Sequence, residues 1–346
     1  MLDWTALEAT IRRDPAGRGL ASFNDADGPL LIGHLENAAR DLAEGRGWAA
    51  IVTGFAIRTE AGPIAETDGP PGAIYLKQML EASGMKTRLV SDPIGEPVID
   101  AGMYPVDLGW YEYRRNCQSH CNDDNGRIGI RRWWRKDIAG PWPGLNASPA
   151  YLIAIERSGP SHTLESVEAE SREEFKRVVP PHERDVCHNM RGVSLDDVTA
   201  PFHVMFEYNE PQDGPIPRTI GILDGGNEIG SGNVPWSVLR RAIAQGSASS
   251  EHAATIPCRI RTDHAILAGV SNWGAYALGA AVAVLRGRRD VVEAWTAERQ
   301  QGLIEAMVRD GGAVDGVTKR REATVDGLAL NDYLAVFEEI RRIALG

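Results

Sequence analysis

Ala49-Ala50-Ile51-Val52 is an apolar run of strand length, and Arg88-Leu89-Val90 is a second one further along the chain. Between them, a segment that begins at Pro70-Pro71 carries apolar residues at helical spacing up to Gly84. Proline in the first turn followed by that spacing predicts a helix. Two strands joined through a helix form a β-α-β unit, whose strands run parallel. We therefore expect a parallel sheet in this part of the chain.

The same alternation continues on both sides of this unit. The pattern predicts further helices over residues 30–44, 234–245, 273–285, 291–308 and 331–343. It predicts further strands over residues 151–155, 219–223, 256–260 and 265–270. The expected fold class is α/β, with a mostly parallel sheet covered by helices on both faces. A length of 346 residues suits one domain, residues 1–346.

Two segments break the alternation. Residues 104–147 form an insertion rich in tryptophan and arginine, and such a long irregular segment is typical of a lid, an insertion or an interface. Residues 158–188 are polar and charged and are predicted to be a second excursion. Cys117, His120 and Cys121 offer ligand types that zinc prefers, although their spacing fits no common zinc finger.

The composition argues against several classes of partner. The formal net charge of −11 repels the phosphate backbone of nucleic acids. The longest apolar stretch, residues 275–285, is shorter than the roughly 20 residues that cross a bilayer, and the N-terminus lacks the pattern of a signal peptide. Four cysteines in a chain of this length do not indicate a disulfide framework. We expect a cytoplasmic protein that acts on a small molecule, without nucleic-acid or membrane partners, and with a homo-oligomer as an open possibility.

Polar, glycine-rich turns follow four of the predicted strands. They are Thr53-Gly54-Phe55 with Glu66-Thr67-Asp68-Gly69 beyond it, Glu156-Arg157, the run from Asp224 to Asn233, and Ser271-Asn272-Trp273-Gly274. Because the carboxyl ends of parallel strands share one edge of a sheet, where ligands bind, we expect these turns to converge. Each turn alone has an equally good structural explanation, since Asp-Gly and Gly-Gly pairs are ordinary turn formers.

Four carboxylates in these turns have no lysine or arginine beside them in the sequence: Glu66, Asp68, Asp224 and Glu228. Clustered carboxylates suit a divalent cation such as Mg²⁺ or Mn²⁺, or general acid–base chemistry. Asp224 and Glu228 are the expected ligands of such a metal. The turns contain neither a G-x-G-x-x-G nor a G-x-x-x-x-G-K-[ST] motif, so we expect no nucleotide cofactor.

The same turns resemble those of the D-glutamate cyclase family. The resemblance runs from about residue 30 to residue 285. It rests on Val52 to Phe55, Glu66 to Ala73, Asn189-Met190-Arg191-Gly192, Asp224 to Gly230 and Gly269 to Gly274. It implies conversion of D-glutamate to 5-oxo-D-proline with loss of water.

Closing this lactam requires a base for the ammonium group, neutralisation of the carboxylate under attack and stabilisation of an oxyanion. We assign the base to Asp68 or Glu66, and metal binding or proton transfer to Asp224 and Glu228. The amides of Gly225 and Gly226, with Asn227 and Asn272, are expected to face the oxyanion. Arg157 and Arg191 are expected to clamp the α-carboxylate, and Thr53, Gly54 and Ser271 to line the site.

Two other functions stay open at this point. The chain could be a cyclase, dehydratase or lactam hydrolase that acts on another amino-acid-like carboxylate, for example in a specialised biosynthesis. It could also be a non-catalytic protein that binds a small carboxylate. Clustered acidic residues count against the second function, because carboxylates repel an anionic ligand.

Overall fold

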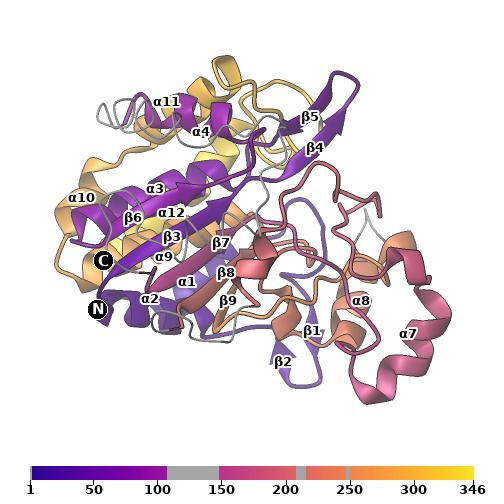
Figure 1. The fold of residues 1–346 in the computed structure, drawn as a ribbon. Coiled ribbons are helices and arrows are strands. Elements are labelled where there is room, and N and C mark those ends of the chain that lie inside the picture. Colours follow the sequence, from indigo (N-terminus) through magenta and orange to yellow (C-terminus); the bar gives the residue numbers. More distant parts are fainter. Residues whose placement is uncertain (1, 107–147, 208–215, 247–249) are drawn as a thin grey trace.

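The computed structural model describes residues 2–106, 148–207, 216–246 and 250–346. A five-stranded parallel sheet lies at its centre, in the order β6-β3-β7-β8-β9 (Figure 1). The strands are β3 (Trp48–Thr53), β6 (Lys86–Val90), β7 (Tyr151–Ile155), β8 (Arg218–Leu223) and β9 (His264–Leu267). The predicted parallel sheet is therefore confirmed. Its strands read as continuous apolar runs because both faces are covered.

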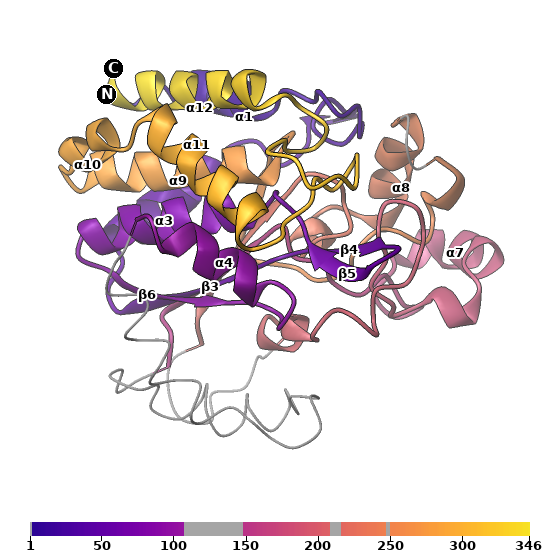
Figure 2. The same ribbon diagram turned by 90° about the horizontal axis from the view of Figure 1, so that it is seen from above.

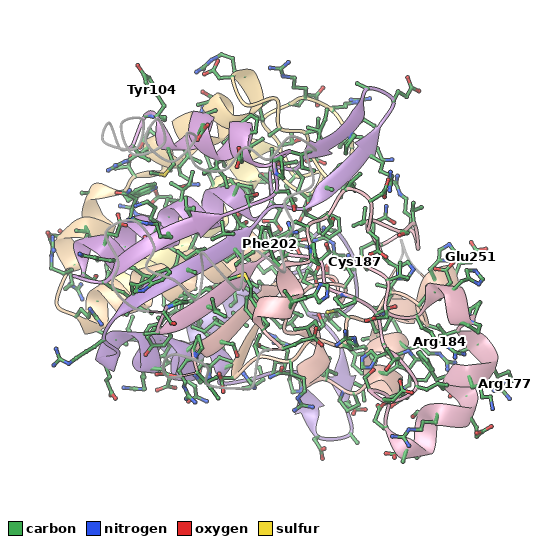
Figure 3. All side chains as sticks on the ribbon, viewed as in Figure 1. Tyr104, Arg177, Arg184, Cys187, Phe202 and Glu251 are labelled. Carbon is green, nitrogen blue, oxygen red and sulfur yellow. The ribbon has the colours of Figure 1, made fainter. Side chains whose placement is uncertain are left out.

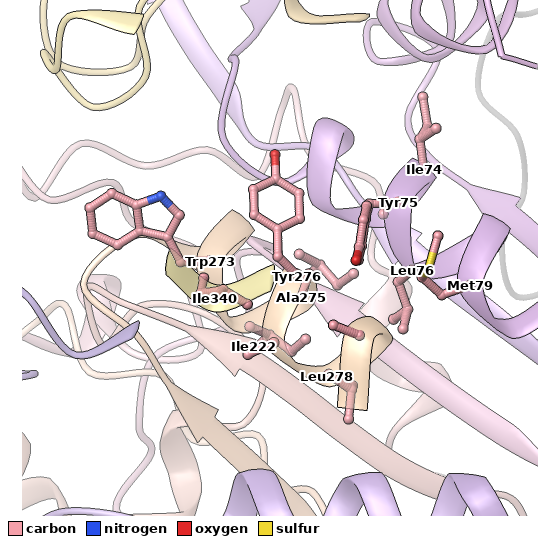
Figure 4. Close-up of a cluster of buried hydrophobic side chains, with 14 of the residues drawn as sticks. Ile74, Tyr75, Leu76, Met79, Ile222, Trp273, Ala275, Tyr276, Leu278 and Ile340 are labelled. Carbon is pink, nitrogen blue, oxygen red and sulfur yellow. The ribbon is translucent and has the colours of Figure 1, made fainter. Parts of the chain in front are cut away.

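Three helices cover the first face of the sheet: α2 (His34–Glu44), α3 (Pro70–Ala82) and α9 (Ser271–Leu285). Ile51, Ile153 and Ile222 point from neighbouring strands into this core. Helix α9 is buried from Ser271 to Ala283, as expected of a helix that is apolar on all sides. It is enclosed because α12 (Leu330–Leu345) and α1 (Trp4–Ile11) form an outer layer beyond it (Figure 2). Figure 4 shows how the aromatic side chains of this core interleave.

The second face is covered less evenly. Helix α8 (Trp236–Gln245) packs on Leu223, Ala265 and Leu267 at the β8–β9 side. A short 3₁₀ helix, Phe202–Met205, packs over β3 and β7. Helices on both faces are thus confirmed, with irregular structure filling part of the second face.

The remaining elements surround this frame. They are the hairpins β1 (Asn24–Asp25) with β2 (Gly28–Pro29) and β4 (Ala56–Thr59) with β5 (Gly62–Ala65), and helices α4 (Glu96–Met103), α7 (Arg172–Val178), α10 (Arg289–Ala294) and α11 (Ala297–Arg309). The predicted excursion over residues 158–188 contains α7 and none of the strands of the central sheet. Figure 3 shows Arg177 and Glu251 at the periphery on this side, far from the sheet.

Two predictions about elements are wrong. Residues 256–260 do not form a strand, because Pro257 has no amide hydrogen to donate. Its neighbours Cys258 and Arg259 donate to Gly226 and Pro160 in loops. The predicted helix over residues 291–308 is two helices, α10 and α11, since Thr296 caps the second by accepting the amide hydrogen of Arg299. Among the described residues, no helix has the length and apolarity needed to cross a membrane.

Candidate active site

Carboxylates from two strand ends meet at the N-terminus of α9. The amide of Ser271 donates to Asp68 Oδ2 (2.9 Å) and to Asp224 Oδ2 (3.2 Å). The amide of Asn272 donates to Asp68 Oδ1 (2.8 Å). Free amide groups and the helix dipole make this end of a helix favourable for negative charge. The structure therefore brings together three of the four turns at the carboxyl edge of the sheet, and Glu156 belongs to the fourth.

The turn that carries Asp68 is held by the side chain of Asn272. Asn272 Oδ1 accepts the amide hydrogens of Gly69 (3.0 Å) and Gly72 (2.8 Å), and Nδ2 donates to the carbonyl of Thr67 (3.1 Å). Gly69 has a φ of +94°, and a Cβ there would lie 2.8 Å from Thr53 Oγ1. Only glycine fits this turn without strain.

Glu156 directly follows β7 and completes the acidic cluster. Its φ is +45°, a region that costs a non-glycine residue on the order of 1–3 kcal/mol and that is found at functional sites. Ser271 Oγ donates to Glu156 Oε2 at 2.6 Å. Asp68, Glu156 and Asp224 each offer an oxygen within 4.8 Å of the others. We refer to these three residues as the acidic cluster.

The cation beside the acidic cluster is Arg18, from the loop that follows α1. Its Nη1 donates to Asp224 Oδ2 at 2.6 Å, and both terminal nitrogens donate to Asp326 at 2.8 Å. Such a bidentate pair fixes the guanidinium plane. Asp224 Oδ1 is buried and has no hydrogen-bond partner among the described residues. One oxygen of Asp224 is thus held, and the other is left open, without a hydrogen bond to any described residue.

Burial raises the pKa of the carboxyl groups gathered here. It raises the pKa of Asp68 from 3.8 to about 7, with the charge of Asp326 as the next cause. The pKa values of Glu66, Glu156, Asp224 and Glu228 are also raised, in each case mainly by burial. Carboxylates that face one another in a buried site cannot all ionise cheaply. At neutral pH such a site therefore retains protons or takes up a cation.

In the turn after β8, backbone amides donate to a side chain of the same turn. The amides of Gly225 and Gly226 donate to the two oxygens of Glu228, at 3.0 Å and 2.8 Å. Asn227 Nδ2 donates to the carbonyl of His188 at 2.8 Å. These donors, and Nδ2 of Asn272, were expected to face an oxyanion, but here they already have acceptors. Glu228, expected to bind metal with Asp224, anchors this turn and is not one of the three residues of the acidic cluster, although its charge contributes, after burial, to the raised pKa values of Glu156 and Asp224. Both assignments stay predictions.

Arg157 does not point to the acidic cluster. It is fully buried and pairs with Asp92, while its terminal nitrogens also donate to the carbonyls of Gly54 (2.9 Å) and Ala200 (2.6 Å). The guanidinium also lies 4.8 Å from the ring centre of Phe202. These contacts join the loops that contain Gly54, Asp92 and Ala200. The structure thus gives Arg157 a structural role in place of the expected one as a substrate clamp.

Two further predicted residues lie in different settings. Arg191 is exposed on a turn, where its backbone amide donates to Asn189 Oδ1. No contact in the described structure joins its side chain to the acidic cluster. Thr53 is buried beside Gly69, and its Oγ1 has no partner among the described residues. Thr53 is therefore placed to face the site, whereas Arg191 is not.

Sequence reasoning missed three residues of this site: Glu156, Arg18 and Asp326. Glu156 had a signal, because it follows a buried strand directly, as Asp224 does. Arg18 and Asp326 lie in loops near the two ends of the chain, 308 residues apart, and no local pattern points to either.

Other sequence-based hypotheses concern places away from the acidic cluster. Cys117, His120 and Cys121 lie outside the described residues. A cavity of about 500 Å³ is present in the described structure, but Leu152, Thr219 and Asp263 line it. These residues lie at the amino ends of β7, β8 and β9, so the cavity is at the opposite edge of the sheet from the acidic cluster.

Comparison with known proteins supports one family. The model of a family described as D-glutamate cyclase-like, C-terminal, matches residues 7–181 and 178–341. The human protein D-glutamate cyclase, mitochondrial, is 27% identical to this chain over 287 residues. That alignment covers 81% of this chain and 38% of the human protein. The chain thus spans well under half the length of this curated relative.

Proposed function

This chain belongs to the D-glutamate cyclase-like family, and from that premise we propose that it converts D-glutamate to 5-oxo-D-proline with loss of water. The observation that carries the proposal is the acidic cluster, in which Asp68, Glu156 and Asp224 from three strand ends lie within 4.8 Å of one another. It lies at the strand edge where α/β proteins bind ligands.

The proton balance of the reaction explains why such a site needs several carboxyl groups. The amine nitrogen bonds to the γ-carboxyl carbon, one C–O bond breaks, and water leaves. The ammonium group gives up two protons, and both end on the departing oxygen. One group must accept a proton from nitrogen while another donates one to oxygen. Carboxyl groups with raised pKa values, some ionised and some protonated near neutral pH, can do both.

We assign the base to Glu66, the remaining buried carboxylate of the Asp68 turn. Glu66 is adjacent to the acidic cluster, since the charge of Asp68 contributes to its raised pKa. A Cβ on Gly316 would lie 1.8 Å from Glu66 Oε2, so the glycine leaves room for this carboxylate. Asp68 is the alternative base. A Glu66→Gln variant that keeps full turnover would favour Asp68.

We also propose that the acidic cluster binds Mg²⁺ or Mn²⁺. Carboxylate oxygens suit these hard cations, and Asp224 Oδ1, which has no hydrogen-bond partner in the part of the chain that the structure describes, offers a ligand atom. A bound cation would polarise the γ-carboxyl group. The three carboxylates are oriented by hydrogen bonds from the backbone amides at the start of α9, from Ser271 Oγ and from Arg18.

The pH dependence of stability tests this cation proposal. Because the pKa of Asp68 is raised to about 7, the folded protein without a cation binds more protons than the unfolded chain between about pH 4 and pH 7. Its free energy of unfolding should fall as pH rises through this window. A cation binds the ionised carboxylates, so at about pH 8 it should raise the melting temperature, and at about pH 5 it should do so far less.

Thermal unfolding with and without saturating Mg²⁺ or Mn²⁺ measures this effect. A cation at one hundred times its Kd stabilises the folded state by about 2.7 kcal/mol. Glu156→Gln should remove most of the response. A melting temperature that neither cation changes at about pH 8 would exclude the cation but leave the proton-transfer role of the cluster.

A substrate panel tests the function itself. The protein is incubated with D-glutamate and L-glutamate, with each cation, and 5-oxoproline is measured by chiral chromatography and mass spectrometry. We expect product from D-glutamate only. Calorimetric heat without product on long incubation would identify a binding protein and would contradict the proposal.

A further inference from the structure

We propose that a buried hydrogen-bonded chain, Trp295–Gln300–Tyr276–Tyr333, positions Asn272 and through it the turn that carries Asp68. These four are positioning residues, because none of them belongs to the acidic cluster. The inference rests on the proposed function where it concerns turnover, and on contacts alone where it concerns the turn.

The contacts run without a break from the outer helices to α9. Trp295 Nε1 donates to Gln300 Oε1 (2.9 Å), and Gln300 Nε2 donates to Tyr276 Oη (2.7 Å). The hydroxyls of Tyr276 and Tyr333 lie 2.6 Å apart. The Asn272 side chain donates to the Tyr333 hydroxyl, and the Tyr333 ring stacks on Trp273, the neighbour of Asn272, with ring centres 5.9 Å apart. The five side chains are buried, with at most 2% of any of them exposed.

The chemistry of the groups fixes the direction of the outer part of the chain. An indole N–H can only donate, so Gln300 must turn its oxygen to Trp295 and its NH₂ to Tyr276. The hydroxyls of Tyr276 and Tyr333 share one hydrogen bond, in which either can donate. At the inner end, the hydroxyl oxygen of Tyr333 accepts from the Asn272 amide group. Such buried chains strengthen their members cooperatively.

The inner end of this hydrogen-bonded chain, at Tyr333, favours one orientation of the Asn272 side-chain amide. Oδ1 accepts the amide hydrogens of Gly69 and Gly72, and Nδ2 donates to Thr67. A flipped amide would place NH₂ against two N–H donors and leave buried groups unpaired. Nδ2 carries two hydrogens, one for the carbonyl of Thr67 and one for the hydroxyl oxygen of Tyr333, so Tyr333 favours this same orientation. The chain thus fixes the group that holds the Asp68 turn.

The same aromatic layer contains a matched control. Tyr75 packs edge-on against Tyr276, with ring centres 5.2 Å apart, and it is also fully buried. Its hydroxyl has no hydrogen-bond partner among the described residues. Tyr75→Phe and Tyr333→Phe therefore remove the same atom from the same layer, and only the second breaks the chain. Figure 4 shows the side chains of Tyr75 and Tyr276 next to each other.

Hydrogen exchange, measured by mass spectrometry on the full chain, tests the positioning. In Tyr333→Phe we expect faster exchange at the amides of Gly69, Gly72, Ser271 and Asn272, with other helices unchanged. Tyr75→Phe should exchange as the wild type does. Tyr276→Phe breaks the chain one link further away and should act as Tyr333→Phe does, which provides a second variant if the first folds poorly. Unchanged exchange in both chain variants, or an equal change in Tyr75→Phe, would overturn the inference.

Turnover of D-glutamate gives the second readout. Loss of an outer partner of a site residue typically lowers activity by about 10- to 100-fold, so kcat of Tyr333→Phe should fall by about that factor, with little change in KM. Tyr75→Phe should keep the wild-type kcat. If the wild-type protein forms no product, the proposed function fails, while the exchange experiment still decides whether the chain positions the turn. An active wild type with an equal kcat in Tyr333→Phe would overturn the inference.

Discussion

Asp224→Asn should lower turnover of D-glutamate by about 10²- to 10⁴-fold, the range for loss of an acid–base group, while the melting temperature stays nearly unchanged. The structure explains why the two effects separate. Asp224 Oδ2 accepts from Arg18 and Ser271, and Oδ1 has no partner among the described residues. The amide oxygen of asparagine can replace Oδ2, and its NH₂ then occupies the open position. The fold keeps its hydrogen bonds, Arg18 stays paired with Asp326, and the site loses a carboxyl group that can carry a proton or bind a cation.

Thermal unfolding and a product assay on the same preparation measure both effects. Asp27→Asn makes the same change of charge on an exposed residue and should alter neither. A fall in melting temperature of many degrees in Asp224→Asn, or full turnover, would show that Asp224 serves the fold rather than the reaction.

Arg18→Met should cause the largest loss of stability that a single substitution at the site produces. The side chain of Arg18 is only 13% exposed, and its guanidinium joins Asp224 to Asp326. Removing one partner of a buried ion pair leaves an uncompensated charge, which costs about 3–5 kcal/mol. We expect this loss near neutral pH, together with loss of turnover, because Asp224 is no longer oriented. At about pH 5 the loss should be smaller, since the carboxyl groups then take up protons.

Chemical denaturation at the two pH values checks this prediction. Arg13→Met is the matched control, because Arg13 forms an ion pair with Glu339 while 48% of its side chain is exposed. Exposed pairs contribute about 0–1 kcal/mol. If Arg18→Met were no more destabilising than Arg13→Met, the ion pairs of Arg18 would not be what holds the two loops at the site.

The sequence predicted the sheet and the convergence of its turns because both follow from strand pattern and chain topology. β3 and β7 are buried over their whole length and β8 from Ile220 to Leu223, and the carboxyl ends of parallel strands lie at one edge of the sheet. The predicted strand at residues 256–260 was wrong, and Pro257 within it already argued against a strand. α10 and α11 are separate helices because Thr296 caps the start of the second one. Their two amphipathic patterns follow each other so closely that the sequence looks like one helix.

The roles within the site were harder to predict, for three physical reasons. Glu156 and Arg157 are neighbours, and the sequence does not tell which of them faces the acidic cluster; the structure turns Glu156 to Ser271 and Arg157 to Asp92. The amides of Gly225 and Gly226 bond a carboxylate on their own turn, a local competition that short polar segments often favour. Arg18 reaches the site from a distant loop, and a single sequence carries no signal for such a contact.

The central claim is that the amine attacks the γ-carboxyl group at the acidic cluster. D-Glutamate labelled with oxygen-18 in both γ-carboxyl oxygens tests it most directly. The wild-type protein should give 5-oxo-D-proline with one label in its lactam carbonyl and release the other label in water, and Asp224→Asn should give almost none of either. Labelled substrate that stays unchanged with Mg²⁺ and with Mn²⁺, or an Asp224→Asn variant that releases labelled water as fast as the wild type, would contradict the account.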